Sequence, residues 1–170
     1  MIWFHKAVQE LLVDADRVHP NPRNANNGDV DAIVESLHIN GCYRPIYAAS
    51  DGEIVAGHHL YQGLLQEGCT QVPVMFIDGD AAQARRILLG DNQIASLARM
   101  DHGLLLDLLE DVMREDESLL GTGFIDDDVV HLKAEQDPKP PEDHEAFISQ
   151  TEITCPECGH SWTMRREQVV

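Results

Sequence analysis

The sequence has few basic residues and few aromatic ones. Lys and Arg number 12 against 30 Asp and Glu, so the formal net charge is −18 at pH 7. A field of that sign repels nucleic-acid phosphates and excludes unaided nonspecific DNA binding by the whole surface, although a local basic patch or a partner can override it. Aromatic residues make up 5% of the chain, but the hydrophobic fraction of 43% is sufficient for a core. The length of 170 residues fits one domain with appendages.

Long apolar segments and a cysteine framework are also missing. No run reaches the ~18 apolar residues that a membrane span needs. The start, Met1–Lys6, has neither the apolar region nor the small-residue cleavage site of a signal peptide. The chain has four Cys, a usage that fits a reducing compartment rather than a disulfide scaffold. We therefore expect a cytoplasmic protein without a membrane partner.

Hydrophobic periodicity predicts an α/β fold with a small mixed sheet and flanking helices. Runs of strand length occupy residues 7–13, 45–48, 53–56 and 72–77. Helical spacing begins near residues 30, 58, 81, 102 and 126. Asp29 and Asp101 are expected N-caps, and Gly41 is expected to end the first long helix. The helix from residue 81 to about 100 is either continuous or broken near Gly90.

The composition divides the chain into four parts. Residues 1–100 form the predicted α/β domain, residues 101–136 a helical extension, residues 137–150 a Pro-rich linker, and residues 151–170 a terminal module. The extension carries an apolar stripe, which consists of Leu104, Leu105, Leu108, Leu109 and Val112. Such a stripe buries against a neighbour, so it is either core or a homodimer face.

One stretch of the α/β domain has the pattern of an anion site. Residues 52–68 read as a short strand, a bend at Gly57, and a helix that opens on His58 and His59. Glycine lets the backbone approach a ligand closely, and the helix start presents free N–H groups with the positive end of its dipole. Neither a complete Walker motif nor a GxGxxG is present. Successive helical residues point about 100° apart, so one histidine is expected to face the ligand and the other to pack.

The terminal module contains a CPxCG turn. Cys155 and Cys158 have the spacing that directs two thiolates at one metal ion, and the short segments on either side can form the arms of a β-knuckle. Structural Zn²⁺ needs four ligands, so His160, His144 or the cysteine pair of a second chain would complete the site. The alternative is a disordered tail with two free thiols.

The order of short motifs resembles the N-terminal domain of the ParB/sulfiredoxin superfamily over about residues 7–100. The motifs are Asn21-Pro22-Arg23-Asn24, a helix closing at Gly41, Arg44-Pro45-Ile46, Gly52 to His58, Val72-Pro73-Val74, and Asp91-Asn92-Gln93. The stretch from Leu120 to Leu132 and the CPxCG tail look like phage-type members, which would place the protein in a host cytoplasm. A helix-turn-helix of the partition-protein type is not evident after residue 100.

The resemblance implies a nucleotide site at residues 57–60. The corresponding loop holds the triphosphate of CTP in partition proteins and ATP in sulfiredoxin. The glycine and a sulfiredoxin-type histidine, His59, are retained. His58 stands where sulfiredoxin has its reactive cysteine, which excludes that reductase chemistry on this loop. Leu60 stands where an arginine would supply a phosphate fork.

We therefore predict a ParB-like protein that binds CTP or ATP with Mg²⁺ and acts in DNA metabolism, in partition, modification or a nuclease-like reaction. The expected ligand-binding residues are Arg23, Arg44, Gly57, His58, His59 and Asn92. Asp91 and Asn92 are candidate Mg²⁺ ligands. Whether the chain is an enzyme stays open, with His59 and Asp91 as the candidate catalytic residues. The alternatives are a non-catalytic adaptor with a degenerate cleft that works through its helical face and zinc tail, and a metal-dependent nuclease or phosphotransfer enzyme.

Overall fold

The computed structural model describes residues 1–136, 149–154 and 160–166. The chain divides into two compact units, Met1–Ala134 and Glu135–Val170, which are treated separately below. Within the described ranges, no helix combines the length and the apolar character that crossing a membrane requires.

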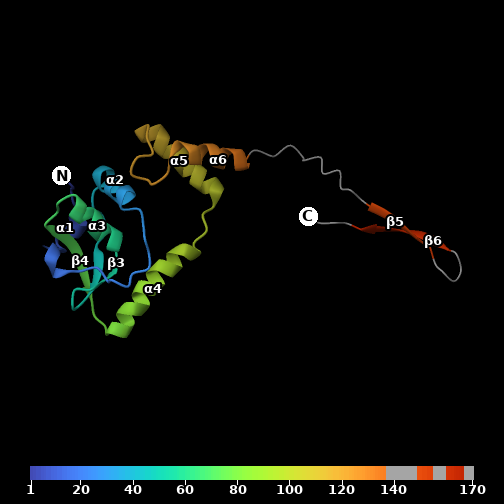
Figure 1. Ribbon diagram of the computed structural model, residues 1–170. Coiled ribbons are helices and arrows are strands. Elements are labelled where there is room, and N and C mark those ends of the chain that lie inside the picture. Colours follow the sequence, from blue (N-terminus) through green and yellow to red (C-terminus); the bar gives the residue numbers. More distant parts are fainter. Residues whose placement is uncertain (137–148, 155–159, 167–170) are drawn as a thin grey trace. The chain divides into compact units, whose positions relative to one another are not determined.

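The first unit is built on a four-stranded mixed sheet (Figure 1). Its strand order is β1 (Leu12–Asp14), β4 (Gln71–Ile77), β2 (Ile46–Ala49) and β3 (Ile54–Ala56). β4 is antiparallel to β1 and parallel to β2, and β2 and β3 form an antiparallel hairpin. The predicted α/β class with a small mixed sheet is confirmed.

The start of the chain differs from the prediction. The expected strand over residues 7–13 is wrong, because Lys6–Gln9 forms the short helix α1 and only Leu12–Asp14 pairs with β4. The apolar residues of this run also have helical spacing, and the run is too short for its periodicity to distinguish the two structures. The availability of a partner strand decides where β1 begins. A 3₁₀ turn, Ala15–Arg17, follows it.

The helices α2 (Val30–Asn40) and α3 (His58–Gln66) form where the sequence predicts them. The Asp29 side chain accepts a hydrogen bond from the Ala32 N–H and caps α2, and Gly41 ends α2 with a φ of 67°. The two helices pack closely at Gly63 of α3, where a Cβ atom would lie 3.2 Å from Ile33 of α2. A glycine here therefore permits the close approach of α2 and α3.

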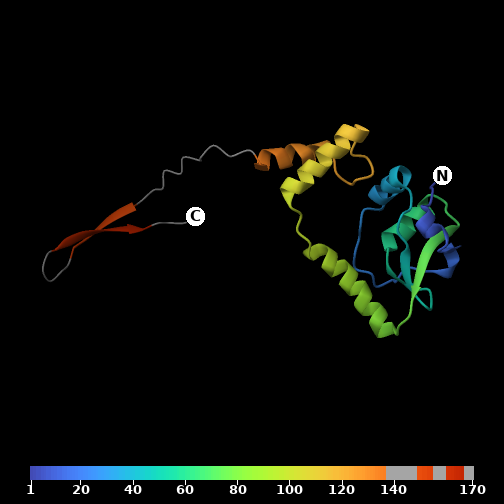
Figure 2. The same cartoon turned by 180° about the vertical axis from the view of Figure 1, so that it is seen from behind.

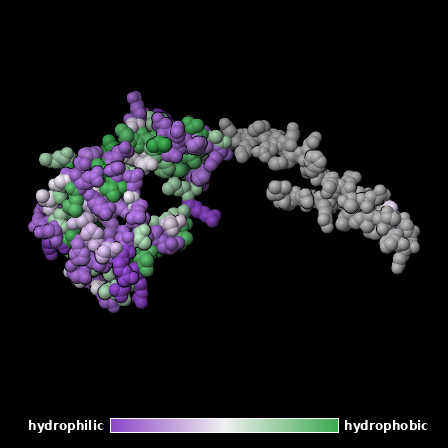
Figure 3. Space-filling model, viewed as in Figure 1, coloured by the Kyte–Doolittle hydropathy of each residue, from purple (hydrophilic) through white to green (hydrophobic). Residues whose placement is uncertain are grey.

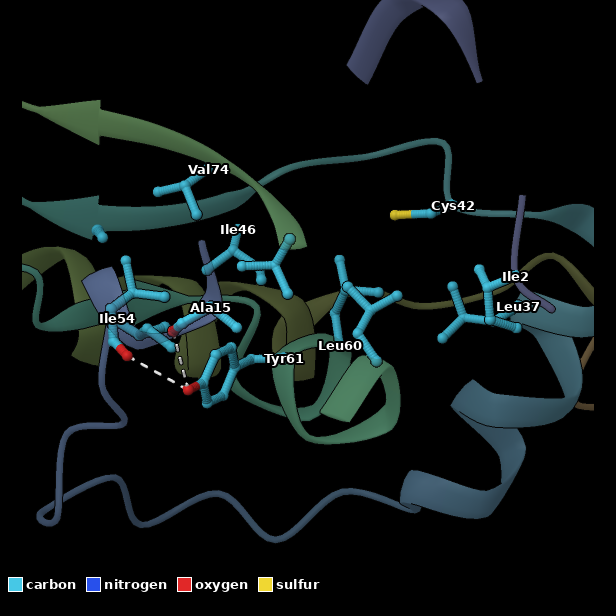
Figure 4. Packing of buried hydrophobic residues seen from close by; sticks show 13 residues of the cluster. Ile2, Ala15, Leu37, Cys42, Ile46, Ile54, Leu60, Tyr61 and Val74 are labelled. Atoms are coloured by element: carbon cyan, nitrogen blue, oxygen red, sulfur yellow. Dashed lines mark hydrogen bonds between the residues drawn. The ribbon is translucent and has the colours of Figure 1, made fainter. Parts of the chain in front are cut away.

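The main core lies between these helices and one face of the sheet (Figure 4). Ile46, Ile54 and Leu64 are fully buried in it. The hydroxyl of Tyr61 faces the carbonyl oxygens of Ala15 and Val18, each at 3.2 Å. This buried tyrosine therefore ties α3 to the 3₁₀ turn after β1.

The helix α4 (Ala81–Leu97) packs against the sheet through a second cluster, in which Ala84 contacts Ala49 and Val55. It starts directly after β4, as the reverse view shows (Figure 2). α4 runs through Gly90 without interruption. A glycine inside a helix costs only about 1 kcal/mol relative to alanine, so the flanking turns keep the helix intact.

The helices α5 (His102–Asp116) and α6 (Asp126–Gln136) build a core of their own. The predicted stripe on α5 is divided: Leu105, Leu109 and Val112 belong to this core, whereas Leu104 and Leu108 are 64% and 63% exposed. Part of the stripe is therefore core, and part of it lies on the surface.

The connection between α5 and α6 is joined to α2 through hydrogen bonds at one glycine. The Gly121 N–H donates to Oε1 of Glu35 at 2.8 Å, and the Gly121 carbonyl accepts from the Asn40 amide at 2.9 Å. Gly121 has a φ of 80°, and a Cβ atom there would lie 2.8 Å from Ile39, so a larger residue would disturb this contact.

The second unit contains an antiparallel hairpin of β5 (Ser149–Thr154) and β6 (Ser161–Arg166), with Thr154 opposite Ser161. His160 lies immediately before β6 and is exposed. The zinc-knuckle prediction depends on Cys155 and Cys158, which lie outside the described residues, as does the linker from 137 to 148.

Replacing Tyr61 with Phe should lower the free energy of unfolding by about 0.5–1.5 kcal/mol, because two buried carbonyl oxygens lose their hydroxyl partner. Urea denaturation followed by circular dichroism measures the change. Tyr43→Phe is the matched control, since Tyr43 is 56% exposed. Equal effects of the two substitutions would contradict a structural role for the Tyr61 hydroxyl.

Candidate functional site

The first unit contains a cleft of about 270 Å³ at the start of α3. This volume is slightly below the roughly 300–1,000 Å³ typical of small-molecule sites. Its lining comes from four separate segments of the chain. The lining residues are Asn24, Asn26, Gly28, Asp29, Ile33, Arg44, Pro45, Tyr47, Ala56, Gly57, His58, His59, Leu60, Asp91 and Asn92.

Gly57 makes the bend from β3 into α3 and borders the cleft. Its φ of 87° lies in the left-handed region, and a Cβ atom would lie 3.3 Å from Cα of Ile46. As the N-cap of α3, glycine offers no side chain to the first N–H groups of the helix. These groups have no partner within a helix, so they remain donors for a ligand at the positive end of the α3 dipole.

His58 points into the protein. It is 7% exposed, and its Nε2 accepts a hydrogen bond from the Asn21 N–H at 3.3 Å. Burial lowers the pKa of His58 below its ordinary value of 6.5, the neighbouring His59 lowers it further, and Asp91 opposes the change. His58 is thus a neutral acceptor that positions the loop containing Asn21.

His59 lies beside a loop that forms one wall of the cleft. We call this loop, residues 24–29, the strap. Nε2 of His59 is 2.7 Å from the Gly28 nitrogen and 3.2 Å from the Asn26 carbonyl oxygen. A Cβ atom at residue 28 would lie 2.7 Å from Nδ1 of the same ring, so glycine permits this contact. The two histidines therefore have different environments, as their helical spacing predicts.

Asn92 holds the other end of the strap. Its Nδ2 donates to Oδ1 of Asn24 at 3.0 Å, and its Oδ1 accepts from Nδ2 of Asn26 at 3.1 Å. Both halves of the carboxamide are engaged, so the strap is connected to α4. The predicted ligand-binding residue Asn92 thus makes structural contacts at the edge of the cleft.

The structure brings together most of the residues that the sequence singles out. Arg44 and Asp91 line the cleft with Gly57 and the two histidines. Arg23 does not line it and is exposed. Arg44 is thus the one arginine among the lining residues. In the parts of the chain that the structure describes, no cluster of three His, Cys, Asp or Glu side chains could hold a metal ion.

Leu60 belongs to the core rather than to the polar wall. It is 4% exposed and packs in the same cluster as Leu37 and Tyr61 (Figure 4). The position at which the resemblance implies a phosphate-binding arginine is therefore used for packing, and α3 supplies no guanidinium group at this point.

Sequence reasoning missed the strap. The sequence patterns single out neither Asn26, Gly28 nor Tyr47, and they include Asn24 only as the last residue of a motif, but all four line the cleft. The signal that could have identified the strap is the concentration of asparagine, with four between residues 21 and 27. Asparagine side chains both donate and accept, which suits a loop held by side-chain contacts.

Comparisons with known proteins bear on the fold. No protein-family model and no curated protein matches the chain. Among solved structures, it is similar to the C-terminally truncated chromosome-partitioning protein ParB from Caulobacter crescentus complexed with CTP-gamma-S, with a TM-score of 0.57 and 16% identity over 71% of this chain and 74% of that chain. A second match is a Pnob8-like ParB-N domain, with a TM-score of 0.44 and 14% identity over 89% of this chain and 55% of that one. The Caulobacter match shows a ParB-like fold.

The stability of the first unit should depend on pH through His58. Its pKa is depressed in the folded state, so between that value and 6.5 the unfolded chain binds more protons and stability falls as the pH falls. Replacing His58 with Gln should make the free energy of unfolding less dependent on pH. The slope should change by at most about 1.4 kcal/mol per pH unit, which corresponds to one proton. Urea denaturation at a series of values between about pH 5 and 7.5 measures it.

The control is His38→Gln, because His38 is about half exposed and pairs with Glu67 on the surface. An unchanged pH dependence in the His58 variant would refute the assignment of a buried neutral imidazole.

Removing the Asn92 carboxamide should loosen the strap. Replacing Asn92 with Ala deletes two hydrogen bonds to it, so amide exchange over residues 24–28 should become roughly 2- to 10-fold faster. Hydrogen–deuterium exchange with mass spectrometry measures this. Gln93→Ala, at the next and exposed position, is the control and should leave these amides unchanged.

Proposed function

We propose that the protein binds a nucleoside triphosphate, CTP in the first instance, in the cleft at the start of α3. The observation that carries this proposal is the convergence of Arg44, Gly57 and His59 on one cleft at an uncapped helix start. The fold shared with a ParB structure complexed with CTP-gamma-S supports the choice of nucleotide.

The phosphate groups would lie against the N–H groups that follow Gly57. A helix start favours anions through its free donors and its dipole, and Arg44 adds a guanidinium that can donate two parallel hydrogen bonds. These groups are the positive features of a cleft that also contains the carboxylates of Asp29 and Asp91, on a chain whose net charge is −18. Because Leu60 is core, binding depends on fewer cationic groups than the resemblance implies.

Magnesium would enter with the nucleotide. Mg²⁺ is commonly bound by one or two carboxylates together with substrate phosphates and waters. Asp91 lines the cleft and can supply such a carboxylate, as can Asp29. The carboxamide oxygen of Asn92 already accepts a hydrogen bond from Asn26, which makes Asp91 the stronger candidate of the predicted pair.

The proposed process is DNA metabolism of the ParB-like kind, such as partition or modification, in a phage-type protein of the host cytoplasm. The acidic surface means that DNA would be contacted through a partner or a local site. A nuclease or phosphotransfer reaction would require His59 and Asp91 to act with a metal ion. We keep this as an alternative because both residues line the same cleft.

A non-catalytic adaptor is the second candidate function. It is favoured by large apolar side chains on the surface of the helices after the sheet and of the connections between these helices: Leu97, Met100, Leu104, Leu108, Leu120 and Val130 are all more than half exposed. Figure 3 shows hydrophobic side chains among the polar ones over α5 and α6. We also propose that Cys155, Cys158 and His160 hold Zn²⁺ in the terminal module, where a metal would complete a second interaction site.

Replacing Arg44 with Ala should weaken CTP binding about 10- to 100-fold, because hydrogen bonds to charged groups contribute about 1.5–3 kcal/mol. Isothermal titration calorimetry with CTP and Mg²⁺ measures the dissociation constant, with ATP as the competing candidate. The control is Arg85→Ala, since Arg85 is an exposed arginine of α4 that does not line the cleft.

Wild-type protein that binds neither nucleotide at millimolar concentration would overturn the nucleotide proposal and leave the adaptor as the better one. Equal affinities of the Arg44 and Arg85 variants would show that binding occurs outside this cleft.

A further inference from the structure

One ring nitrogen in the cleft has both a donor and an acceptor within hydrogen-bonding distance. Nε2 of His59 lies 2.7 Å from the Gly28 nitrogen, which carries a proton, and 3.2 Å from the Asn26 carbonyl oxygen, which accepts one. A ring nitrogen either accepts or donates at a given moment, according to whether it carries a proton. The two contacts are therefore alternatives that depend on the charge of the ring.

In the neutral ring with its proton on Nδ1, Nε2 accepts from the Gly28 N–H. The shorter of the two distances corresponds to this form. When a proton from solvent binds to Nε2, the ring becomes a cation, loses the Gly28 hydrogen bond and donates to the Asn26 carbonyl instead. The Gly28 N–H then needs another acceptor, and Gly28 itself lines the cleft.

We propose that binding of a phosphate-bearing anion in this cleft is coupled to the uptake of one proton by His59. The proton creates a positive charge beside the ligand and releases the Gly28 N–H as an additional donor for it. This inference rests on the proposed function for the identity of the ligand, but the proton-dependent exchange of partners follows from the contacts of His59 alone.

The surrounding charges make the coupling depend on the ligand. Arg44 lines the same cleft, and Arg44 and the positive end of the α3 dipole repel a second positive charge in the absence of an anion. The carboxylates of Asp29 and Asp91 also line it and act in the opposite sense. A bound polyphosphate adds several negative charges to this balance and so favours the imidazolium form.

The strap can accommodate this exchange without leaving the cleft. The side chains of Asn24 and Asn26 stay bonded to the Asn92 carboxamide, and Nε2 of His59 exchanges the Gly28 N–H for the Asn26 carbonyl oxygen. Gly28 has no Cβ atom that would separate its backbone from the imidazole ring. His59 thus acts on the ligand directly through its charge and indirectly through the Gly28 N–H.

Calorimetry in buffers of different ionisation enthalpy counts the protons taken up on binding. CTP and inorganic tripolyphosphate serve as probes on wild type and on His59→Gln, a variant that retains hydrogen-bonding capacity but cannot take up the proton. His38→Gln is the matched control, because His38 pairs with Glu67 on the surface. Protons bound by the probes themselves, or by His58, contribute to all three proteins and cancel in the comparison.

We expect wild type and the His38 variant to take up about one proton more than the His59 variant, and their affinity to rise by up to about tenfold per unit fall in pH. The His59 variant should bind with an affinity that varies less with pH. Equal proton uptake and equal pH profiles in all three proteins would overturn the proposal.

Nuclear magnetic resonance of the ligand-free wild type separates this inference from the proposed function. With ¹⁵N labelling, we expect Nε2 of neutral His59 to be unprotonated and the Gly28 amide resonance to shift with the same midpoint as the His59 ring. That result would support the exchange even if no nucleotide binds. A Gly28 amide that does not respond while His59 titrates, or a neutral ring with its proton on Nε2, would overturn it.

Discussion

The left-handed bend at Gly57 is the constraint on which the site depends. A φ of 87° and the 3.3 Å approach to Cα of Ile46 leave no room for a side chain without strain, so β3 can turn directly into α3 against the sheet. This turn places the start of α3 at the cleft and determines the directions of the next three side chains. A substitution at Gly57 would therefore disturb the core and the cleft together.

The three residues after Gly57 then have three different environments. His58 is buried and neutral and holds Asn21, His59 lies against the strap, and Leu60 packs in the core. Because neither His58 nor Leu60 presents a positive charge to the cleft, the start of α3 is less cationic than a helix start that carries an arginine. In the proposed phosphate site, the dipole of α3 and Arg44, the one arginine among the lining residues, would supply most of the attraction.

The strap and α4 are distant in sequence but form one wall of the cleft. Asn92 of α4 contacts Asn24 and Asn26 through its side chain, so a ligand that changes the position of the strap also acts on α4. After α4 the chain continues into helices whose exposed side chains include Leu104 and Leu108. The proposed nucleotide site is thus linked along the chain, through α4, to the exposed side chains on which the adaptor proposal rests.

The sequence by itself determined the elements whose signals are local. Asp29 and Gly41 delimit α2, and the glycine-histidine pattern at residue 57 identifies the start of α3, because capping and backbone sterics act within a few residues. It also identified Arg44 and Asp91 as candidate ligand residues, both of which line the cleft.

Only the tertiary structure decided the features that depend on partners far along the chain. The first strand begins at Leu12 because β4 is available to pair with it, and Arg23 lies outside the cleft although its motif is near. The strap owes its position to Asn92 and His59, which are 68 and 31 residues away from their contacts Asn24 and Gly28. Such hydrogen bonds require the folded arrangement of α3 and α4, which no local pattern specifies.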